Sequence, residues 1–276
     1  MTKSIHIKDT VFSLETPRVM GILNVTPDSF SDGGKYNSLE AALLQAEKML
    51  SEGADILDIG GCSSRPGAAE VSTQEELDRV MPVVEKLISE MSVILSVDTF
   101  RSIVAAEAIA AGAHIINDIS AGDDDDKMIS TVAELGVPYI AMHKKGLPKT
   151  MQNNPEYGDV VTEVFHYLEL KVKQCRDAGI KDIVIDLGYG FGKTIEHNYE
   201  LLKKLTEFQD IGVPILTGVS RKSMIFRVLD IQASEALNGT TFLHAYALQG
   251  GSSILRVHDV KEAVECVRLY SQLAKV

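Results

Sequence analysis

A short apolar segment followed by an amphipathic helix recurs eight times along the 276 residues of this sequence. The first unit starts in MGILNVTPDSFSDGG (20–34), where an apolar run ends in a polar loop, and a helix is predicted over residues 38–52. The other predicted strands cover residues 54–61, 93–98, 114–118, 137–143, 182–186, 213–218 and 254–257. Short apolar strands that alternate with amphipathic helices are typical of a parallel sheet covered by helices on its outer face.

The number of units selects the architecture. Eight strand–helix units in about 250 residues are the count and size of a (β/α)8 TIM barrel, an α/β fold. A doubly wound open sheet is the competing arrangement, and the unit count favours the barrel. Residues 4–16 alternate apolar and polar side chains, which predicts a small hairpin that plugs one end of the fold. Because no Pro-, Gly- or Ser-rich segment divides residues 1–276, we expect one domain, with residues 1–17 as a hairpin extension.

Charge and cysteine content exclude several classes of protein. With 39 acidic and 27 basic residues the net charge is −12, which disfavours nucleic acid or an anionic membrane as a partner. No apolar segment is long enough to span a bilayer, and the first residues lack the apolar core of a signal peptide. Cys62, Cys175 and Cys266 are isolated and without CxxC spacing, which fits a reducing cytoplasm and not a disulfide or zinc framework.

Polar residues stand at the ends of the predicted strands. In a barrel these ends meet at one face, where barrel enzymes carry out their chemistry. Asp98, Asn117 and Asp186 supply two carboxylates and an amide, which suit a flat heterocycle that presents several N–H groups and ring nitrogens. Asp58, inside the second strand, is either a polar residue of the barrel interior or a support for these groups. His143 is either an acid–base group or a structural donor.

Cations gather at the same face although the chain as a whole is acidic. They are Arg65, Lys193, Arg221, Lys222, Arg256 and His258. The loops after the seventh and eighth strands are a common phosphate site in barrels, so this set predicts a phosphorylated ligand. Asn24 offers an amide oxygen, the kind of hard ligand that suits Mg²⁺ on such phosphates.

Three further motifs are interpreted without assigning them catalysis. The segment DLGYGFGKT (186–194) fails the spacing of a P-loop and of a dinucleotide fingerprint, and we interpret it as a flexible glycine-rich loop of the site. The carboxylate run at 123–126 precedes a predicted helix, so solvation and the helix dipole explain it better than metal binding. Cys62 has no activating base in the sequence and is not expected to be a nucleophile.

The ordered motifs resemble the dihydropteroate synthase family. They are MGILNVTPDSFSDGG (20–34), GGCSSRPG (60–67), SVDTFR (96–101), IINDIS (115–120), AMHKKGLPKTMQ (141–152), DLGYGFGK (186–193), GVSRKS (218–223) and LRVHDV (255–260). The resemblance implies an Mg²⁺-dependent transferase of folate biosynthesis. It would join 6-hydroxymethyl-7,8-dihydropterin diphosphate to 4-aminobenzoate and release pyrophosphate, and it would act as a homodimer.

The resemblance also implies a role for individual residues. The pterin would be held by Asp98, Asn117, Asp186 and Lys222. Arg256 would pack on the pterin ring, and the diphosphate and Mg²⁺ would be served by Arg256 with Asn24, Arg65 and His258. The aminobenzoate would be bordered by Ser64, Pro66, Phe191 and Ser223. The set expected to carry catalysis is therefore Asn24, Arg65, Asp98, Lys222, Arg256 and His258, with Asn24 as the metal ligand.

Two other classes share part of this pattern. A pterin-binding barrel of the corrinoid methyltransferase type has a similar Asp and Asn set but needs no diphosphate site, so the cations of GVSRKS and LRVHDV favour the synthase. A pterin-binding paralogue without catalysis is the other alternative, and the presence of Asn24, Arg65, Lys222 and Arg256 argues against it.

Overall fold

Eight parallel strands close into a barrel in the computed structural model, which describes residues 3–25, 35–62, 71–146, 151 and 155–275. Each strand pairs with its neighbour in the sequence, and the last strand pairs with the first. The strands are β3 Arg18–Asn24, β4 Ile56–Gly60, β5 Ile94–Asp98, β6 Ile115–Asp118, β7 Tyr139–Met142, β8 Ile183–Asp186, β9 Ile215–Thr217 and β10 Ile254–Val257. The predicted barrel is confirmed, and the open sheet is excluded because β3 and β10 are hydrogen-bonded.

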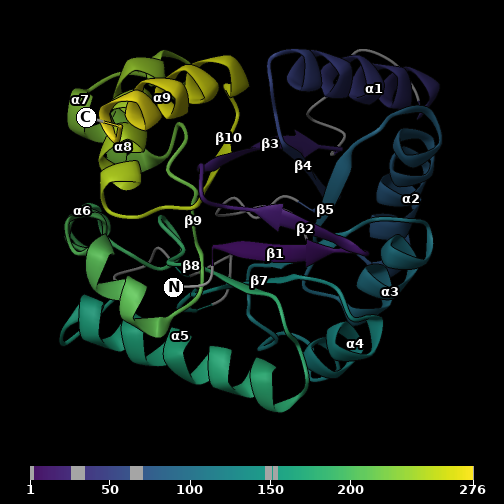
Figure 1. Ribbon diagram of the computed structural model, residues 1–276, viewed down its shortest axis with the longest axis horizontal. Coiled ribbons are helices and arrows are strands. Elements are labelled where there is room, and N and C mark those ends of the chain that lie inside the picture. The colour runs from purple at the N-terminus through teal and green to yellow at the C-terminus, as the bar shows by residue number, and fades with distance from the viewer. Residues whose placement is uncertain (1–2, 26–34, 63–70, 147–150, 152–154, 276) are drawn as a thin grey trace.

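Helices surround the barrel as a ring (Figure 1). They are α1 Lys35–Ser51, α2 Thr73–Glu90, α3 Ser102–Ala110, α4 Met128–Leu135, α5 Val160–Asp177, α6 Ile195–Lys203, α7 Ser223–Leu229, α8 Leu237–Gln249 and α9 Val260–Leu273. The helix expected over residues 197–208 is instead α6 followed by the 3₁₀ segment η2 Leu205–Ile211, which ends where Gly212 adopts a left-handed conformation with φ of 80°. In the described part of the chain, no helix is both long and apolar enough to cross a bilayer.

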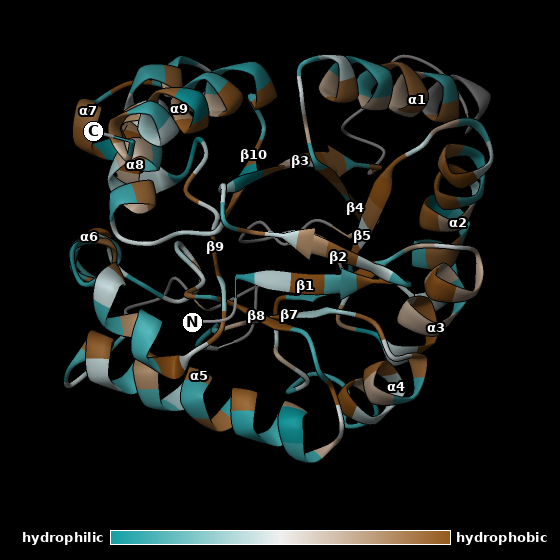
Figure 2. Ribbon diagram, viewed as in Figure 1, coloured by the Kyte–Doolittle hydropathy of each residue, from teal (hydrophilic) through white to brown (hydrophobic). Residues whose placement is uncertain are grey.

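The alternation of side chains along each strand divides the structure into an outer and an inner core. Outward-facing residues such as Leu57, Val97 and Ile185 are fully buried against the helices. The strands are accordingly brown over most of their length in Figure 2, whereas the helices mix hydrophobic and hydrophilic residues. This is the expected result for a parallel sheet that is covered on both faces.

Inside the barrel, one layer of side chains is apolar. It consists of Met20, Ile56, Ile94, Ile115, Ile140, Val184, Leu216 and Ile254, one from each strand. Because side chains alternate, the residue two positions further along each strand faces inward as well. These residues are Ile22, Asp58, Ser96, Asn117, Met142, Asp186, Gly218 and Arg256. The layer nearer the N-terminal ends of the strands is therefore hydrophobic. The next layer, toward the C-terminal ends, contains the charged residues Asp58, Asp186 and Arg256.

The N-terminal hairpin completes the apolar layer from below. Strands β1 Ser4–Ile7 and β2 Thr10–Ser13 pair antiparallel around a turn in which Lys8 has a φ of 54°. Ile5, Ile7 and Leu14 are buried in the same cluster as the inward-facing apolar residues of the barrel. Figure 1 shows the hairpin crossing the centre of the ring. The prediction that this segment plugs one end of the fold is confirmed.

The hairpin is expected to stabilise the barrel through its inward side chains. Replacing the buried Ile5 by Ala removes apolar contacts and leaves a cavity, which should lower the free energy of unfolding by about 2–5 kcal/mol. The matched control is Val11→Ala on the same hairpin, where a side chain that is 60% exposed should change stability by no more than about 0.5 kcal/mol. Chemical denaturation of the two variants checks this, and equal effects would contradict a plugging role.

Candidate active site

The strand register brings the ends of four neighbouring strands level. Asn24 pairs with Gly60, Gly60 with Asp98, and Asp98 with Asn117. Gly60 leaves room between its neighbours, since a β-carbon placed there would lie 3.5 Å from Asn24 Oδ1 and 3.8 Å from Asp98 Oδ2. The amide of Asn24 and the carboxylate of Asp98 therefore both lie next to a residue without a side chain.

Arg256 links two carboxylates at the centre of the barrel mouth. Its Nε donates to Asp58 Oδ2 and its NH2 donates to Asp98 Oδ2, both at 2.6 Å. Asn117 Nδ2 donates to the same Asp58 oxygen at 3.0 Å. Asp58 is completely buried, so it serves as a support that orients Arg256 and Asn117 from below. This resolves the open question about Asp58.

Burial of this charged cluster shifts its protonation equilibria. Desolvation raises the pKa of Asp98 to about 7; the Arg256 guanidinium opposes the rise and the Asp58 carboxylate adds to it. Desolvation disfavours the charge on Arg256, but the Asp58 and Asp98 carboxylates outweigh it and raise the guanidinium pKa. The site thus has a permanent cation next to a carboxyl group that exchanges its proton near neutral pH.

A second charged pair lies across the barrel mouth. A β-carbon at Gly218 would lie 3.8 Å from both Asp186 Oδ2 and Lys222 Nζ, so these two groups flank that glycine. Asp186 Oδ1 accepts the backbone N–H of Gly188 at 2.8 Å. Lys222 Nζ donates to the carbonyl of Tyr189 at 2.5 Å. Desolvation lowers the pKa of Lys222 to about 8, with the Asp186 carboxylate opposing the shift, so the amine stays largely protonated at pH 7.

Phe191 borders the same pair. Lys222 Nζ lies 4.9 Å from the centroid of the Phe191 ring, which places an aromatic face beside the buried cation. Ser223 is the first residue of α7, and Lys222 occupies the cap position of that helix. The structure thus brings Asp186, Phe191, Lys222 and Ser223 together, as the sequence predicted. Ser64, Arg65 and Pro66 lie outside the described residues.

The glycine-rich segment after β8 is packed closely against the end of β7. A β-carbon on Gly188 would come within 1.9 Å of the His143 carbonyl oxygen, and one on Gly192 within 2.1 Å of the Lys145 carbonyl oxygen. Both glycines have positive φ, and any side chain would displace the backbone beside them. The interpretation of a flexible loop is therefore wrong for these positions, where glycine is required for close backbone contact.

Lys193 and His143 brace this segment from inside. Lys193 Nζ is 2.9 Å from His143 Nδ1 and donates to the carbonyls of Gly188 at 2.9 Å and Phe191 at 3.2 Å. Lys193 is 2% exposed, so its assignment to the anion-binding cations is corrected. Burial, reinforced by Lys193, lowers the pKa of His143 to about 2, which leaves a neutral imidazole that accepts a hydrogen bond. His143 is structural and not an acid–base group.

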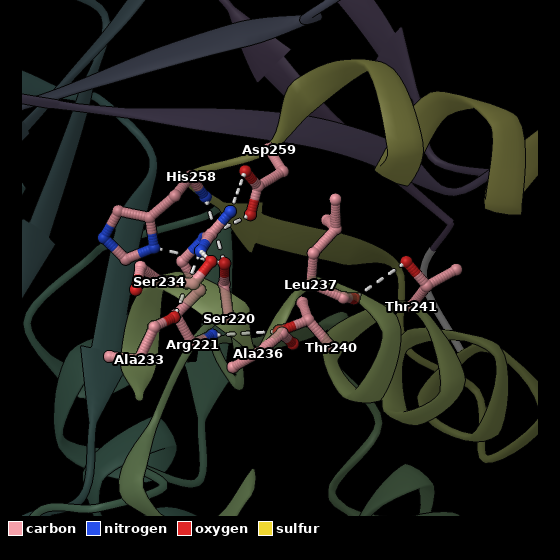
Figure 3. Close-up of polar contacts among 10 residues, drawn as sticks. All are labelled: Ser220, Arg221, Ala233, Ser234, Ala236, Leu237, Thr240, Thr241, His258 and Asp259. Atoms are coloured by element: carbon pink, nitrogen blue, oxygen red, sulfur yellow. Dashed lines mark hydrogen bonds and ion pairs between the residues drawn. The ribbon is translucent and has the colours of Figure 1, made fainter. Parts of the chain in front are cut away.

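The assignment of Arg221 to the anion-binding cations is also corrected. Its guanidinium binds the Asp259 carboxylate through Nε and NH2, each at 2.8 Å, and NH1 donates to backbone carbonyls of Ala233 and Ser234 (Figure 3). These donors all have partners within the chain. Arg221 therefore connects the loop after β9 to the residue that precedes α9. His258, the next residue of the predicted anion set, lies beside Ser220 at a distance of 3.1 Å between Nδ1 and Oγ.

Three of the four carboxylates at 123–126 have partners within the chain. Within the carboxylate run, Asp123 pairs with Lys171, Asp124 pairs with Lys144, and Asp125 accepts the N–H of Ser102. Among the described residues, no group of three or more His, Cys, Asp and Glu side chains forms a metal site.

Cys62 also lacks nucleophilic character. Arg101 NH1 lies 3.4 Å from its sulfur, and Glu76 pairs with the same guanidinium. Desolvation, with the Glu76 carboxylate adding to it, raises the pKa of Cys62 to about 12. The side chain is therefore a thiol at neutral pH, and the thiolate that nucleophilic attack needs is not populated.

Comparison with known proteins identifies the family. Residues 20–258 match the family described as pterin binding enzyme. The chain is 49% identical to dihydropteroate synthase of Escherichia coli (strain K12) over 262 residues, which are 94% of this chain and 93% of that protein. The chain belongs to the dihydropteroate synthase family.

Solved structures of synthases agree in fold over their whole length. A Yersinia pestis dihydropteroate synthase in a sulfonamide drug complex is 44% identical, with a TM-score of 0.93 over 99% of this chain and 100% of that one. The Xanthomonas albilineans synthase with 4-aminobenzoic acid is 40% identical, with a TM-score of 0.93 over 100% of both chains. Both likenesses extend beyond the barrel to the N-terminal segment.

Sequence reasoning missed the residues that support the site of this synthase family member. Asp58 was left undecided, although its position two residues beyond the inward-facing Ile56 was enough to place it inside the barrel. Ser220 was given no role of its own within GVSRKS (218–223). The burial of Glu76 could not be predicted, because a glutamate in an amphipathic helix is usually expected to face solvent. In the structure it is fully buried and pairs with Arg101.

The charge of Asp58 is expected to add to the raised pKa of Asp98. Asp58→Asn removes a nearby negative charge and leaves Arg256 with one carboxylate partner, so the pKa of Asp98 should fall from about 7 toward its ordinary value. A carboxyl ¹³C titration of aspartate-labelled protein measures this. Asp182→Asn, which removes a charge beside His6 of the N-terminal hairpin, is the control and should leave the pKa of Asp98 unchanged. An unshifted Asp98 in Asp58→Asn would contradict the proposed coupling.

Proposed function

We propose that this chain is a dihydropteroate synthase of folate biosynthesis. It transfers the 7,8-dihydropterin-6-ylmethyl group from its diphosphate to 4-aminobenzoate and releases pyrophosphate. The observation that carries the proposal is the cluster of Asp98, Asn117, Asp186, Lys222 and Arg256 at the barrel mouth of a chain that belongs to this family. The synthase bound to 4-aminobenzoic acid, with 40% identity, supports the choice of acceptor.

The pterin is assigned to the barrel mouth, between the two charged groups of side chains. A dihydropterin presents an amino group and ring N–H donors beside carbonyl and ring-nitrogen acceptors. Asp186 and Asn117 are nearly buried, and a buried polar ligand edge needs partners of this kind. Asp186 accepts N–H groups, Lys222 donates to an acceptor, and the planar Arg256 guanidinium packs on the ring. The fixed partners of Arg256 hold it in place before the ligand arrives.

The diphosphate and Mg²⁺ are assigned to the side of the mouth that includes Asn24, Arg256 and His258, together with Arg65. Among the described residues no acidic metal-binding cluster exists, so the protein supplies few ligands to the ion. This fits Mg²⁺, which usually keeps several waters and binds through one or two protein oxygens and substrate phosphates. Asn24 Oδ1 is the protein oxygen proposed for it. When bound, Mg²⁺ supplies positive charge that stabilises the departing pyrophosphate.

The reaction needs no covalent intermediate on the protein. The bond between the methylene carbon and the diphosphate oxygen breaks, and a bond from that carbon to the amino nitrogen of 4-aminobenzoate forms, after which the nitrogen releases a proton to solvent. Arg256 and His258 stabilise the charge that develops on the leaving group. Phe191 and Ser223, with Ser64 and Pro66, border the acceptor so that its nitrogen is aligned with the carbon.

The decisive experiment is pyrophosphate release by the pure protein. It is measured with Mg²⁺ and the pterin diphosphate, in the presence and absence of 4-aminobenzoate. Release that depends on both 4-aminobenzoate and Mg²⁺ is expected, and EDTA should abolish it. Pterin binding without aminobenzoate-dependent release would indicate a non-catalytic paralogue, and methyl transfer from a methylated pterin would indicate the methyltransferase type.

Arg256 is expected to be essential for turnover. Arg256→Gln keeps a polar side chain but removes the charge that faces the leaving group, so kcat/KM should fall by about 10²–10³. Arg18→Gln is the matched control, because Arg18 pairs with Asp55 at the N-terminal end of the barrel and should retain near-normal activity. Steady-state kinetics with both substrates measures the two variants, and near-normal activity of Arg256→Gln would remove Arg256 from the mechanism.

We also propose that the chain forms a homodimer through helices α8 and α9, which pack side by side (Figure 1). Phe242, Tyr246, Leu269 and Leu273 expose large apolar side chains on these helices and are here called the α8–α9 patch. The spacing of four residues within each pair puts both members on one helix face. A cluster of this kind is typical of a surface that a second subunit covers.

Two broader assignments complete the proposal. We place the protein in the cytoplasm, which the free thiols of Cys62, Cys175 and Cys266 support. We treat residues 1–276 as a single domain, since the first and last barrel strands pair and the N-terminal hairpin contributes to the inner core.

A charge in the α8–α9 patch is expected to dissociate the dimer. Phe242 is 68% exposed in the isolated chain, so Phe242→Glu should fold normally but sediment as a monomer, because burying an unpaired carboxylate in an interface is unfavourable. Leu170→Glu on α5 is the control with a similarly exposed leucine, and it should remain dimeric. Analytical ultracentrifugation distinguishes the outcomes. A monomeric wild type, or a dimer that survives Phe242→Glu, would refute this interface.

A further inference from the structure

We propose that Ser220 and Arg221 are positioning residues that hold His258 in one orientation and one neutral tautomer, with the ring hydrogen on Nε2. The consequence for catalysis rests on the proposed function, in which His258 faces the diphosphate. The position and tautomer of the ring follow from contacts within the chain.

The hydroxyl of Ser220 determines the tautomer. Its Oγ accepts the backbone N–H of His258 at 3.2 Å and lies 3.1 Å from Nδ1 of the same residue (Figure 3). Among the described residues no acceptor other than Nδ1 contacts this hydroxyl, so we assign its single hydrogen to Nδ1. Nδ1 is then the acceptor, and the hydrogen of a neutral imidazole resides on Nε2. Ser220 is 3% exposed, which keeps water from competing for the hydroxyl.

Arg221 fixes the position of that hydroxyl. Its bidentate ion pair holds Asp259, the residue directly after His258, while Ser220 holds His258 itself. Two consecutive residues that follow β9 are thus fastened to two consecutive residues that follow β10. A planar guanidinium that binds a carboxylate through two nitrogens fixes distance and orientation together.

The backbone of Arg221 is held as firmly as its side chain. Its φ of 52° lies in the left-handed region, which is unfavourable for a residue with a β-carbon. Its N–H donates to Thr240 Oγ1 at 3.1 Å, and that hydroxyl donates to the Ala236 carbonyl at 2.8 Å. Surrounding contacts therefore maintain a conformation that the residue would not adopt alone.

The arrangement places the hydrogen of the neutral ring on Nε2. In Figure 3 the second ring nitrogen of His258 points away from Ser220 and the other residues drawn. His258 follows Arg256 by two positions, so it extends the same side of the barrel mouth. An Nε2–H donates to a phosphate oxygen, whereas the other neutral tautomer would present a lone pair to it. The tautomer thus decides whether neutral His258 attracts or repels the leaving group.

The tautomer is tested directly by ¹⁵N NMR of histidine-labelled protein at pH 8, without substrate. At that pH an imidazole of ordinary pKa, about 6.5, is neutral. His258→Gln identifies the His258 resonances among those of the seven histidines. The expected wild-type pattern is an unprotonated Nδ1 and a protonated Nε2, and Ser220→Ala should give a mixture. A wild-type His258 with the hydrogen on Nδ1 would overturn the inference.

Kinetics tests the consequence for catalysis. Ser220→Ala should raise the KM for the pterin diphosphate about tenfold, the equivalent of one lost hydrogen bond, and leave the KM for 4-aminobenzoate within about twofold. Ser220→Thr keeps the hydroxyl and should restore the wild-type tautomer and KM. Arg221→Gln should change the pterin diphosphate KM in the same direction as Ser220→Ala. Ser252→Ala removes another buried serine hydroxyl just before β10 and should change neither quantity.

The outcomes separate this inference from the proposed function. A protein without synthase activity would refute the function, while the NMR pattern would still decide the tautomer. A changed tautomer in Ser220→Ala with an unchanged pterin diphosphate KM would overturn the positioning role.

Discussion

The site depends on the arginine that lies between two carboxylates inside the barrel. Arg256 is held by Asp58 from below and by Asp98 from the side, and Asn117 shares the Asp58 oxygen. A guanidinium buried in this way is stabilised only if its partners stay in place, since an unpaired buried charge is strongly unfavourable. The same contacts therefore stabilise the charge and determine the orientation in which it meets a ligand.

The layered interior explains how such a charged cluster is tolerated. Isoleucines and other apolar side chains fill the layer below it, and the N-terminal hairpin covers that layer with Ile5, Ile7 and Leu14. Apolar burial thus stabilises one half of the barrel, whereas the other half contains the charged and polar side chains of the proposed site. The basic side chains at the mouth are divided in a similar way. Lys193 and Arg221 hold backbone segments in place, whereas Lys222 and Arg256 lie beside the carboxylates of the proposed site.

The fold was predictable from the sequence because periodicity is a local signal. Eight short apolar segments with helices between them permit few closed arrangements, and the ends of parallel strands must meet at one face. The clustering of Asp98, Asp186 and Lys222 at the barrel mouth was predictable as well, because each stands at or near the C-terminal end of a strand. The roles of Arg221, Lys193 and Asp58 were not, because each depends on a partner distant in sequence, such as Asp259 or His143. The spacing of residues along the chain does not indicate which basic side chain is paired with a group of the protein itself, as Arg221 is with Asp259.

The pairing of the first and last strands also has a consequence for synthesis. Arg18 of β3 is level with Ile254 of β10, and the hairpin that precedes β3 packs on an interior layer to which β10 contributes. The hairpin therefore has no complete docking surface until β10 has been synthesised. Its apolar side chains, Ile5 and Ile7 among them, lack part of their final contacts until then, because Ile254 belongs to the same cluster.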